Sequence, residues 1–281
     1  MRIKASVEPG RLALVTGGSS GIGLAVARLL AERGMDVWLL ARRAELLQSA
    51  LADLASLRQS PGQRFDALSV DVTDATQTAA AVAKIEKIGI PDLVINCAGV
   101  ARPGYVQELE LDVFRQMMEV NYFGTLHTVK AVLPGMLMRG SGYLVNIASL
   151  AGLVGVFGYT AYGASKFAVR GFSDALRAEL KLHGIGVSLA YPADTDTPQL
   201  AYENQFKPPE TKAVSGGSGL MTTEAFAKIL LRGITRGQYM ILPNFEGKLL
   251  YWLSGIFDLY QDQIVAGVHR KKALEQTERK R

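Results

Sequence analysis

Short apolar runs alternate with amphipathic stretches through most of this sequence, and this alternation limits the folds that the chain can adopt. The apolar runs are rich in Val, Leu and Ile and lie at 12–15, 37–40, 68–70, 93–95, 143–147 and 187–190. The stretches between them repeat apolar residues at helical spacing and lie at 22–33, 44–57, 74–87, 112–137 and 161–183. Strands that are apolar on both faces and separated by helices form a parallel sheet covered on both sides. The sequence therefore predicts a doubly wound α/β domain of the Rossmann type, with ligands at the carboxyl ends of its strands.

The length and composition fit one such domain followed by a distinct segment. With 281 residues, 48% apolar and 20% charged, the chain has an ordinary globular balance, which excludes disordered and fibrous classes. We expect residues 1–246 to form the domain, with 193–221 as a loop over the substrate, and 247–281 to form an amphipathic helix with a basic tail. No apolar run is long enough to span a membrane or to serve as a secretory signal, and the single cysteine, Cys97, fits a reducing compartment. We therefore expect a cytoplasmic protein.

A glycine-rich turn joins the first predicted strand to the first predicted helix. Its sequence, Thr16-Gly17-Gly18-Ser19-Ser20-Gly21-Ile22-Gly23, has the spacing G-x-x-x-G-x-G. Glycines permit a tight turn and let the backbone approach a phosphate, while the start of a helix offers free N–H groups and a positive dipole end. The turn therefore indicates a dinucleotide-binding site.

The end of the second predicted strand indicates which dinucleotide. A site for NAD usually places Asp or Glu there to bind the ribose 2′-hydroxyl. This chain has Arg42 and Arg43 instead, and no carboxylate before Glu45. A guanidinium can pair with a 2′-phosphate, which a carboxylate would repel. The sequence therefore favours NADPH/NADP+ as cofactor.

Tyr162 and Lys166 are four residues apart, so a helix places them on one face. About half a Y-x-x-x-K match is expected by chance at this composition, so the surroundings decide. Ser149 lies just past the fifth predicted strand, Asn121 lies on the preceding helix, and Asn96 ends the fourth strand. These positions bring all five residues to one edge of the sheet.

Proton transfer explains these residue types. A phenol has a pKa near ~10, and a cation about 4 Å away at an effective dielectric near 20 contributes ~4 kcal/mol, enough to lower that pKa by about 3. We expect Lys166, with oxidised nicotinamide, to do this for Tyr162. Ser149 would hydrogen-bond the substrate oxygen as charge develops on it, and Asn121 would hold a water linking Lys166 to solvent.

In order, these residues resemble the short-chain dehydrogenase/reductase family over about residues 12–200. The resemblance implies Asn121, Ser149, Tyr162 and Lys166 as catalytic residues. It also implies that Asp71 and Val72 contact the adenine and that Thr195 and Thr197 contact the carboxamide or pyrophosphate. The full cofactor set is then Thr16, Gly17, Ser19, Ser20, Gly21, Ile22, Gly23, Arg42, Arg43, Asp71, Val72, Asn96, Ala98, Gly99, Tyr162, Lys166, Pro192, Thr195 and Thr197. One departure is Tyr191-Pro192-Ala193, where most members have Pro-Gly.

A narrower resemblance is to the 3-ketodihydrosphingosine reductases within that family. The run Tyr191-Pro192-Ala193-Asp194-Thr195-Asp196-Thr197-Pro198 carries it most specifically. Such reductases convert 3-ketosphinganine to sphinganine with NADPH at a membrane, which implies a long-chain lipid ketone as substrate and a role in sphingolipid synthesis. Eukaryotic members begin with a membrane segment that is absent here, so we expect a bacterial counterpart.

The carboxyl-terminal segment has two interpretations. Leu249, Trp252, Leu253, Ile256, Tyr260 and Ile264 recur at helical spacing, with Ser254, Asp258, Gln261 and Asp262 on the other side. This stripe can pack on the body or on a second subunit, or it can lie in a membrane interface with the basic tail on anionic lipid. Residues 269–281 carry six basic and two acidic side chains, which leaves only +1 of the net +5 for the rest of the chain. That distribution does not suggest a nucleic-acid partner.

Two alternatives to a 3-ketosphinganine reductase remain open. One is another carbonyl reductase of the family, such as a 3-oxoacyl thioester reductase. The other is a non-enzymatic NADPH-sensing protein on the same fold, since fold alone does not fix function. The complete Asn-Ser-Tyr-Lys set favours an enzyme. Family members usually form dimers or tetramers, so we expect a homo-oligomer, and no metal.

Overall fold

A seven-stranded sheet forms the centre of the protein. The computed structural model describes residues 2–215, 219–243, 247, 249, 251, 261, 263–268, 270 and 271. The strand order is β3-β2-β1-β4-β5-β6-β7, and each neighbouring pair is parallel. The strands are β1 (Leu12–Thr16), β2 (Asp36–Ala41), β3 (Phe65–Ser69), β4 (Leu93–Asn96), β5 (Gly142–Ile147), β6 (Ile185–Ala190) and β7 (Met240–Ile241). From β1 the chain first adds strands on one side, as β2 and β3, and then on the other side, beginning with β4. This strand order confirms the predicted doubly wound fold.

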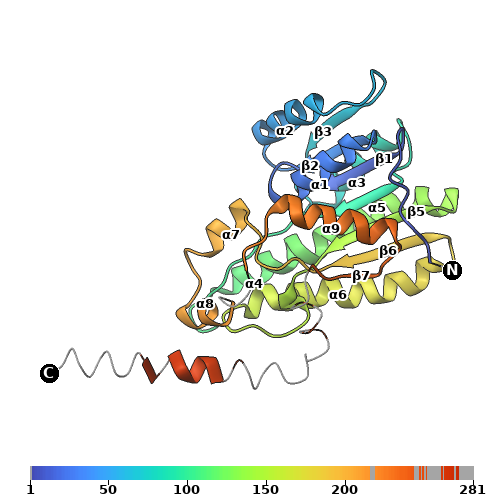
Figure 1. Cartoon of the computed structure of the whole chain (residues 1–281). Coiled ribbons are helices and arrows are strands. Elements are labelled where there is room, and N and C mark those ends of the chain that lie inside the picture. The colour runs from blue at the N-terminus through green and yellow to red at the C-terminus, as the bar shows by residue number, and fades with distance from the viewer. Residues whose placement is uncertain are drawn as a thin grey trace.

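Helices cover both faces of the sheet (Figure 1). One face carries α1 (Gly21–Glu32), α2 (Ala44–Ser56) and α9 (Thr223–Thr235), and the other carries α3 (Ala75–Glu86), α5 (Gly124–Arg139) and α6 (Thr160–Lys181). Successive side chains of a strand point to opposite faces. In β1, Ala13 and Val15 therefore pack under α1 and α9, while Leu12 and Leu14 pack under α3, α5 and α6. Burying each such Val or Leu contributes about 1.5–3 kcal/mol, so apolar residues on both faces of the strands are required.

The strand predicted at 68–70 is β3, which begins earlier, at Phe65, and three further segments differ from the sequence-based expectation. The single helix predicted at 112–137 is α4 (Leu111–Met117), a π-helical turn η1 (Met118–Phe123) and α5. The predicted loop at 193–221 contains two short helices, α7 (Pro198–Glu203) and α8 (Pro209–Ser215), each beginning with a proline, which fits the first turn of a helix. The two-residue strand β7 was not predicted, because so short a run carries no periodic signal.

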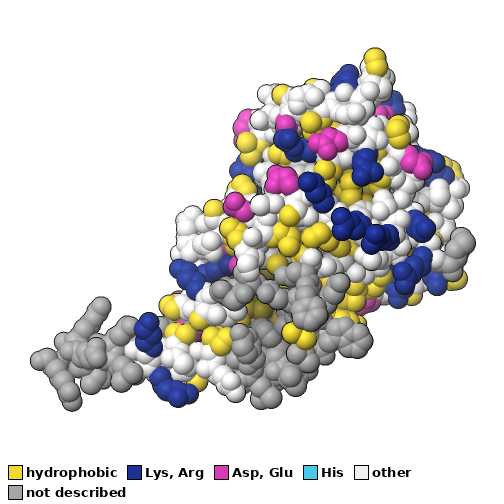
Figure 2. All heavy atoms as spheres, viewed as in Figure 1, with side chains coloured by type: hydrophobic (Ala, Val, Ile, Leu, Met, Phe, Trp, Pro, Cys, Tyr) yellow, Lys and Arg dark blue, Asp and Glu magenta, His cyan; other side chains and the backbone are white. Residues whose placement is uncertain are grey.

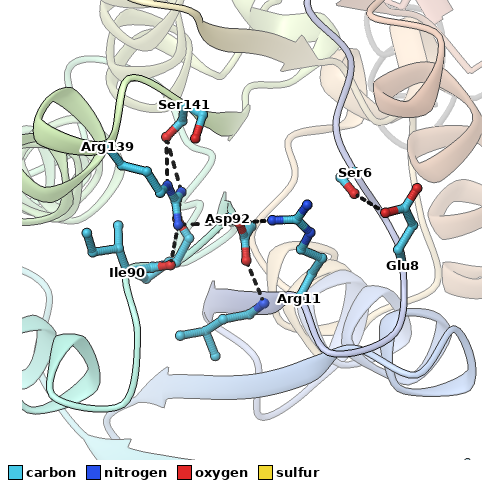
Figure 3. A network of polar contacts seen from close by, with 9 residues as sticks. Ser6, Glu8, Arg11, Ile90, Asp92, Arg139 and Ser141 are labelled. Carbon is cyan, nitrogen blue, oxygen red and sulfur yellow. Dashed lines mark hydrogen bonds and ion pairs between the residues drawn. The ribbon is translucent and has the colours of Figure 1, made fainter.

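A polar cluster around Asp92 joins the amino ends of the central strands (Figure 3). Its carboxylate accepts a hydrogen bond from the backbone N–H of Leu12 at 2.9 Å and forms ion pairs with Arg11 at 3.2 Å and Arg139 at 3.3 Å. Arg139 also donates to the carbonyl oxygens of Ile90 and Pro91. The cluster therefore connects β1, the start of β4 and the end of α5. It lies at the amino ends of the strands, opposite the carboxyl ends where a ligand is expected.

Most of the predicted carboxyl-terminal amphipathic helix lies outside the described residues, including Trp252, Leu253, Ile256 and Tyr260. Of its polar side, Gln261 is described, and its Oε1 accepts a hydrogen bond from the N–H of Phe157 at 2.8 Å. Within the described parts of the chain, no helix is both long and apolar enough to cross a bilayer.

Candidate active site

The glycine-rich turn follows β1 at the carboxyl edge of the sheet. Gly17 has φ +67°, and a Cβ on it would lie 2.8 Å from the backbone of Ala98. A Cβ on Gly23 would collide with the carbonyl oxygen of Gly17. The hydroxyl of Thr16 accepts from the N–H groups of Cys97 and Ala98 at 3.1 and 3.2 Å, which joins the turn to the end of β4. Only glycine therefore lets the turn and α1 approach this closely.

The first turn of α1 is suited to an anion. Ser20 is its N-cap, yet its side chain makes no capping hydrogen bond, and this fully described helix has no acidic residue in its first turn. Free N–H groups and the positive end of the dipole remain available there. The glycine-rich turn and the first turn of α1 together therefore fit the pyrophosphate of a dinucleotide.

The end of β2 supplies positive charge to the same cleft. Arg42 and Arg43 both line it, and Arg42 is 59% exposed at its side chain. A guanidinium nitrogen of Arg42 lies 4.0 Å from a carboxylate oxygen of Asp71. The Asp71 carboxylate is further fixed by Thr73, whose N–H and hydroxyl both donate to it. Two exposed guanidinium groups at the ribose end fit a 2′-phosphate.

Lys166 is buried at the other end of the cleft. It lies on α6, one turn after Tyr162, and its ammonium donates to the carbonyl oxygen of Ile147 at 2.9 Å. The ammonium lies 5.7 Å from the centre of the Tyr162 ring. Burial lowers the pKa of Lys166 to about 8, although the nearby Cys97 and Glu203 oppose that shift.

Asn121 lies within the π-helical turn beside Lys166. Its Oδ1 accepts from the N–H of Val100 at 2.9 Å, and its amide donates to the carbonyl of Val100 and to the hydroxyl of Ser165. A Cβ on Gly99 would lie 3.1 Å from Asn121 Oδ1 and 3.6 Å from the Lys166 ammonium, so these groups surround Gly99. Single π-helical turns are frequent at functional sites because they displace one residue from the regular helix.

Ser149 contacts Tyr162 and also caps a short helix. It is the N-cap of the 3-10 turn η2 (Leu150–Gly152), and its hydroxyl accepts from the N–H of Ala151 at 3.2 Å. Burial raises the pKa of Tyr162, and the interaction of its phenol with the Ser149 side chain opposes that rise. The serine is thus held against the phenol by its own local backbone.

The protein groups around Tyr162 shift the pKa of its phenol upwards. Burial raises the pKa of the Tyr162 phenol above its ordinary value, and the charges of Glu203 and Asp194 raise it further, against the hydrogen bond from Ser149. Sequence reasoning did not predict that the Glu203 and Asp194 carboxylates act on the phenol, so the simple pairing of phenol and ammonium was incomplete.

The structure brings most of the predicted cofactor residues to one cleft. Those that line it are Gly17, Ser19, Ser20, Gly21, Ile22, Gly23, Arg42, Arg43, Asp71, Val72, Ala98, Gly99, Tyr162, Lys166, Pro192 and Thr197. Thr16, Asn96 and Thr195 do not line the cleft, and their side chains instead make hydrogen bonds within the protein. The amide of Asn96 donates to Asn146 at 2.8 Å, and the hydroxyl of Thr195 donates to the carbonyl of Ala193 at 2.8 Å.

Five residues around Tyr162 were given no role in the site by sequence reasoning. Tyr159 packs its ring against that of Tyr162, with centroids 5.4 Å apart, and its hydroxyl donates to the buried carboxylate of Glu203 at 2.9 Å. Gln199 lines the cleft and donates to the other oxygen of Glu203 at 3.0 Å. Lys207 is buried and pairs with Asp194 at 3.1 Å. The charged residues within the predicted loop at 193–221 were the sequence signal that could have indicated these contacts.

The fold and the site define a class of oxidoreductase. The family model described as "short chain dehydrogenase" matches residues 11–208, and the chain belongs to that family. Among curated proteins, a 3-dehydrosphinganine reductase of Danio rerio is 41% identical over 243 residues, which cover 86% of this chain and 73% of that protein. A 3-ketodihydrosphingosine reductase of Bos taurus is 36% identical over 275 residues, covering 95% and 83% of the two chains.

Solved structures agree on the fold. A short-chain dehydrogenase from Sphingobium yanoikuyae in complex with NADPH is 26% identical with a TM-score of 0.75, covering 91% of this chain and 95% of that one. A short-chain dehydrogenase/reductase from Burkholderia phymatum in complex with NAD is 26% identical with a TM-score of 0.79, covering 91% and 96%. Among the described residues, no three His, Cys, Asp or Glu side chains gather as they would around a metal ion.

Proposed function

We propose that this protein reduces 3-ketosphinganine to sphinganine with NADPH. The observation that carries the proposal is the placement of Tyr162 and Lys166 at one end of a cleft whose other end holds the glycine turn and two arginines, with Ser149 acting on Tyr162. Relatives named 3-dehydrosphinganine or 3-ketodihydrosphingosine reductase support the substrate. Arg42 and Arg43 support the phosphorylated cofactor.

The side chains provide a route for one proton. Bound NADPH supplies a hydride to the ketone carbon. Tyr162 donates its phenolic proton to the ketone oxygen, and Ser149 donates a hydrogen bond to that oxygen while negative charge develops on it. Lys166 stabilises the phenolate that remains, and its ammonium is held by the carbonyl of Ile147. Asn121 fixes the backbone of Val100 next to this pair, where a water would resupply the proton.

The assay follows NADPH oxidation with 3-ketosphinganine and, in parallel, with a 3-oxoacyl thioester. We expect turnover of the first at a kcat/KM well above that of the second, and a loss of about 10²–10⁴-fold in kcat for Tyr162→Phe. No turnover of 3-ketosphinganine by the native protein would refute the substrate. Undiminished turnover by Tyr162→Phe would refute the mechanism.

We also propose a cytoplasmic protein that contacts the cytoplasmic membrane face at its periphery. The lipid ketone and the basic tail support this location. So does a hollow near the end of β7 that is lined by Arg2, Arg177, Arg232 and Arg236. Figure 2 shows Lys and Arg side chains gathered over the face that α9 covers. Arginines next to an apolar surface attract anionic lipid headgroups.

Vesicle sedimentation tests this location. We expect the protein to sediment with phosphatidylglycerol vesicles and not with phosphatidylcholine vesicles. Replacing the six basic residues of 269–281 with Gln should weaken the binding at physiological salt. If that variant binds the vesicles as well as the native protein does, the basic tail is not the contact. The double variant Arg232→Gln with Arg236→Gln then tests whether the arginine hollow is the contact.

A homo-oligomer, either a dimer or a tetramer, is the remaining part of the proposal. Leu137 and Met138 on α5, and Phe167 on α6, are large apolar side chains that are exposed in the single chain. Apolar residues on two neighbouring helices are suited to a symmetric interface. Light scattering during gel filtration measures the mass, and a monomer at micromolar concentration would contradict the expectation.

A further inference from the structure

Glu203 is a buried carboxylate at the end of α7 that the proton route does not use. It is 7% exposed, and its two oxygens accept hydrogen bonds from the Tyr159 hydroxyl at 2.9 Å and the Gln199 amide at 3.0 Å. Both donors are neutral. An ionised carboxylate is costly to bury without a cation, so this position demands a reason.

The charges around Glu203 do not balance. Lys207 is almost fully buried and pairs with Asp194 at 3.1 Å. Throughout the described ranges, no Lys, Arg or His nitrogen lies within salt-bridge distance of Glu203. Asp194 therefore takes the nearest ammonium, and Glu203 feels Lys207 and Lys166 only from beyond salt-bridge distance. Burial raises the pKa of Glu203, as a carboxyl without a close cation requires.

Glu203 does not itself line the cleft, but its two hydrogen-bond donors connect it to the reacting groups. Tyr159, its hydrogen-bond donor, packs against the ring of Tyr162. Gln199, its other donor, lines the cleft. The charge of Glu203 raises the pKa values of both Tyr162 and Lys166, so its field reaches the phenol and the ammonium.

The proposed substrate has a positive charge at a fixed position. In 3-ketosphinganine the carbon that carries the amine is bonded to the ketone carbon, so the ammonium is three bonds from the oxygen that Tyr162 protonates. With that oxygen at Tyr162, the ammonium must lie beside it. We propose that Glu203 binds the ammonium group of a 2-amino ketone and so selects such substrates. This inference rests on the proposed function.

Binding of the ammonium would also help the chemistry. In the free protein the carboxylate opposes ionisation of Tyr162. A substrate ammonium at Glu203 would neutralise that charge at the moment when Tyr162 must release its proton. A plain ketone or a thioester lacks the ammonium and leaves the charge unbalanced. The preference should therefore appear in kcat as well as in KM.

The test compares 3-ketosphinganine with 1-hydroxyoctadecan-3-one, which differs in lacking the amine, using the holoenzyme with NADPH. We expect the native protein to prefer the amine by roughly 10–100-fold in kcat/KM. Glu203→Gln, which preserves size and can still accept from Tyr159, should lose most of this preference, because it slows the amine substrate and removes the charge that opposes reduction of the plain ketone. Glu179→Gln, at an exposed position of α6, is the matched control and should keep the preference.

Tyr159→Phe separates binding from positioning. It removes the hydrogen bond to Glu203 but keeps the carboxylate, so the amine preference should persist even if both rates fall. If Tyr159→Phe loses the preference as Glu203→Gln does, Glu203 only positions the tyrosine and the proposal is wrong. Equal kcat/KM for the two ketones with native protein would overturn the proposal while the proposed function stands.

A failure of the proposed function has a different signature. If the native protein reduces neither ketone, calorimetry with the NADP+ complex still compares sphinganine with 1,3-octadecanediol, its amine-free counterpart. Roughly tenfold tighter binding of the amine that is lost in Glu203→Gln would support the ammonium site. Equal affinity for the two would overturn it. Glu203→Asp, which keeps the charge, replaces the Gln variant if thermal melting shows that the latter does not fold.

Discussion

Lys166 shows that a residue can be suited to chemistry at a cost to stability. Its side chain is buried, and it has one described hydrogen bond, to the carbonyl of Ile147. Desolvation disfavours its charged form, which lowers its pKa from 10.5 to about 8. Below pH 8 the native and unfolded chains both carry the charge, so the full cost is present. Above pH 10.5 neither does, and the cost disappears.

We therefore expect Lys166→Met to stabilise the cofactor-free protein by about 2 kcal/mol at pH 7, after allowing for the lost hydrogen bond, and to abolish turnover. The gain should shrink as pH rises from 8 towards 10. Urea unfolding at pH 7, 8, 9 and 10 measures it, with Lys181→Met, at an exposed position of the same helix, as control. A gain that is independent of pH would show that burial of charge is not its cause.

Arg42 and Arg43 provide a second prediction at the same scale. Replacing both with Ala should raise the KM for NADPH by roughly 10–100-fold and change the KM for NADH little, because charge-assisted pairing with the 2′-phosphate is lost. Steady-state kinetics with both cofactors test this. Arg33→Ala, at an exposed position beyond α1, is the control. A parallel rise in both KM values would mean that the arginines do not recognise the phosphate.

Single residues were predictable where chemistry and spacing coincide. Tyr162 and Lys166 lie one helical turn apart, and Arg42 lies at a strand end, so local geometry was enough. Glu203 was not predictable, because its burial depends on how α7 packs over Tyr159. Sequence reasoning treated that region as a loop, and a carboxylate in a loop is ordinarily solvated. For the same reason, sequence reasoning did not include the charge of Glu203 among the groups that act on Tyr162.

At the scale of elements, the contact between α1 and the glycine turn sets the shape of the cofactor site. A Cβ on Gly23 would enter the carbonyl of Gly17, so the helix would have to move away from the turn. We expect Gly23→Ala to weaken cofactor binding by about 100-fold or more and to lower Tm. Fluorescence titration with NADPH measures the binding.

Gly171→Ala is the control for that prediction. Gly171 lies within α6, and a Cβ there would have no atom within 4 Å among the described residues. Alanine favours a helix over glycine by about 0.5–1 kcal/mol, so this variant should be more stable and bind NADPH normally. If Gly23→Ala bound NADPH as well as Gly171→Ala does, close packing at the turn would not be what forms the site.

Periodicity predicted long elements well and short ones badly. The alternation of apolar runs indicated β1, β2, β4, β5 and β6 within a residue or two. The π-helical turn was not predicted, because the stretch 112–137 was interpreted as one continuous helix. The helices α7 and α8 and the strand β7 are short, and tertiary contacts rather than their own pattern stabilise them.

At the scale of the whole molecule, the parallel sheet separates the Asp92 cluster from the cleft. Strands of five or six residues span roughly 17–20 Å, and the two features lie at opposite ends. Asp92→Asn should therefore lower the free energy of unfolding by about 1–3 kcal/mol and leave kcat and KM unchanged. Asp112→Asn, which removes an ion pair on the surface, should change neither. A changed KM in Asp92→Asn would show that the ends are coupled.

The position of that cluster has a consequence for how such a chain can be altered. Substitutions more than about 7–10 Å apart without shared partners usually have additive effects. Changes around Asp92 that raise thermal tolerance should then combine freely with changes around Glu203 that redirect substrate choice. Stabilising substitutions around Asp92 would then allow the chain to tolerate destabilising substitutions around Glu203 that change its substrate specificity.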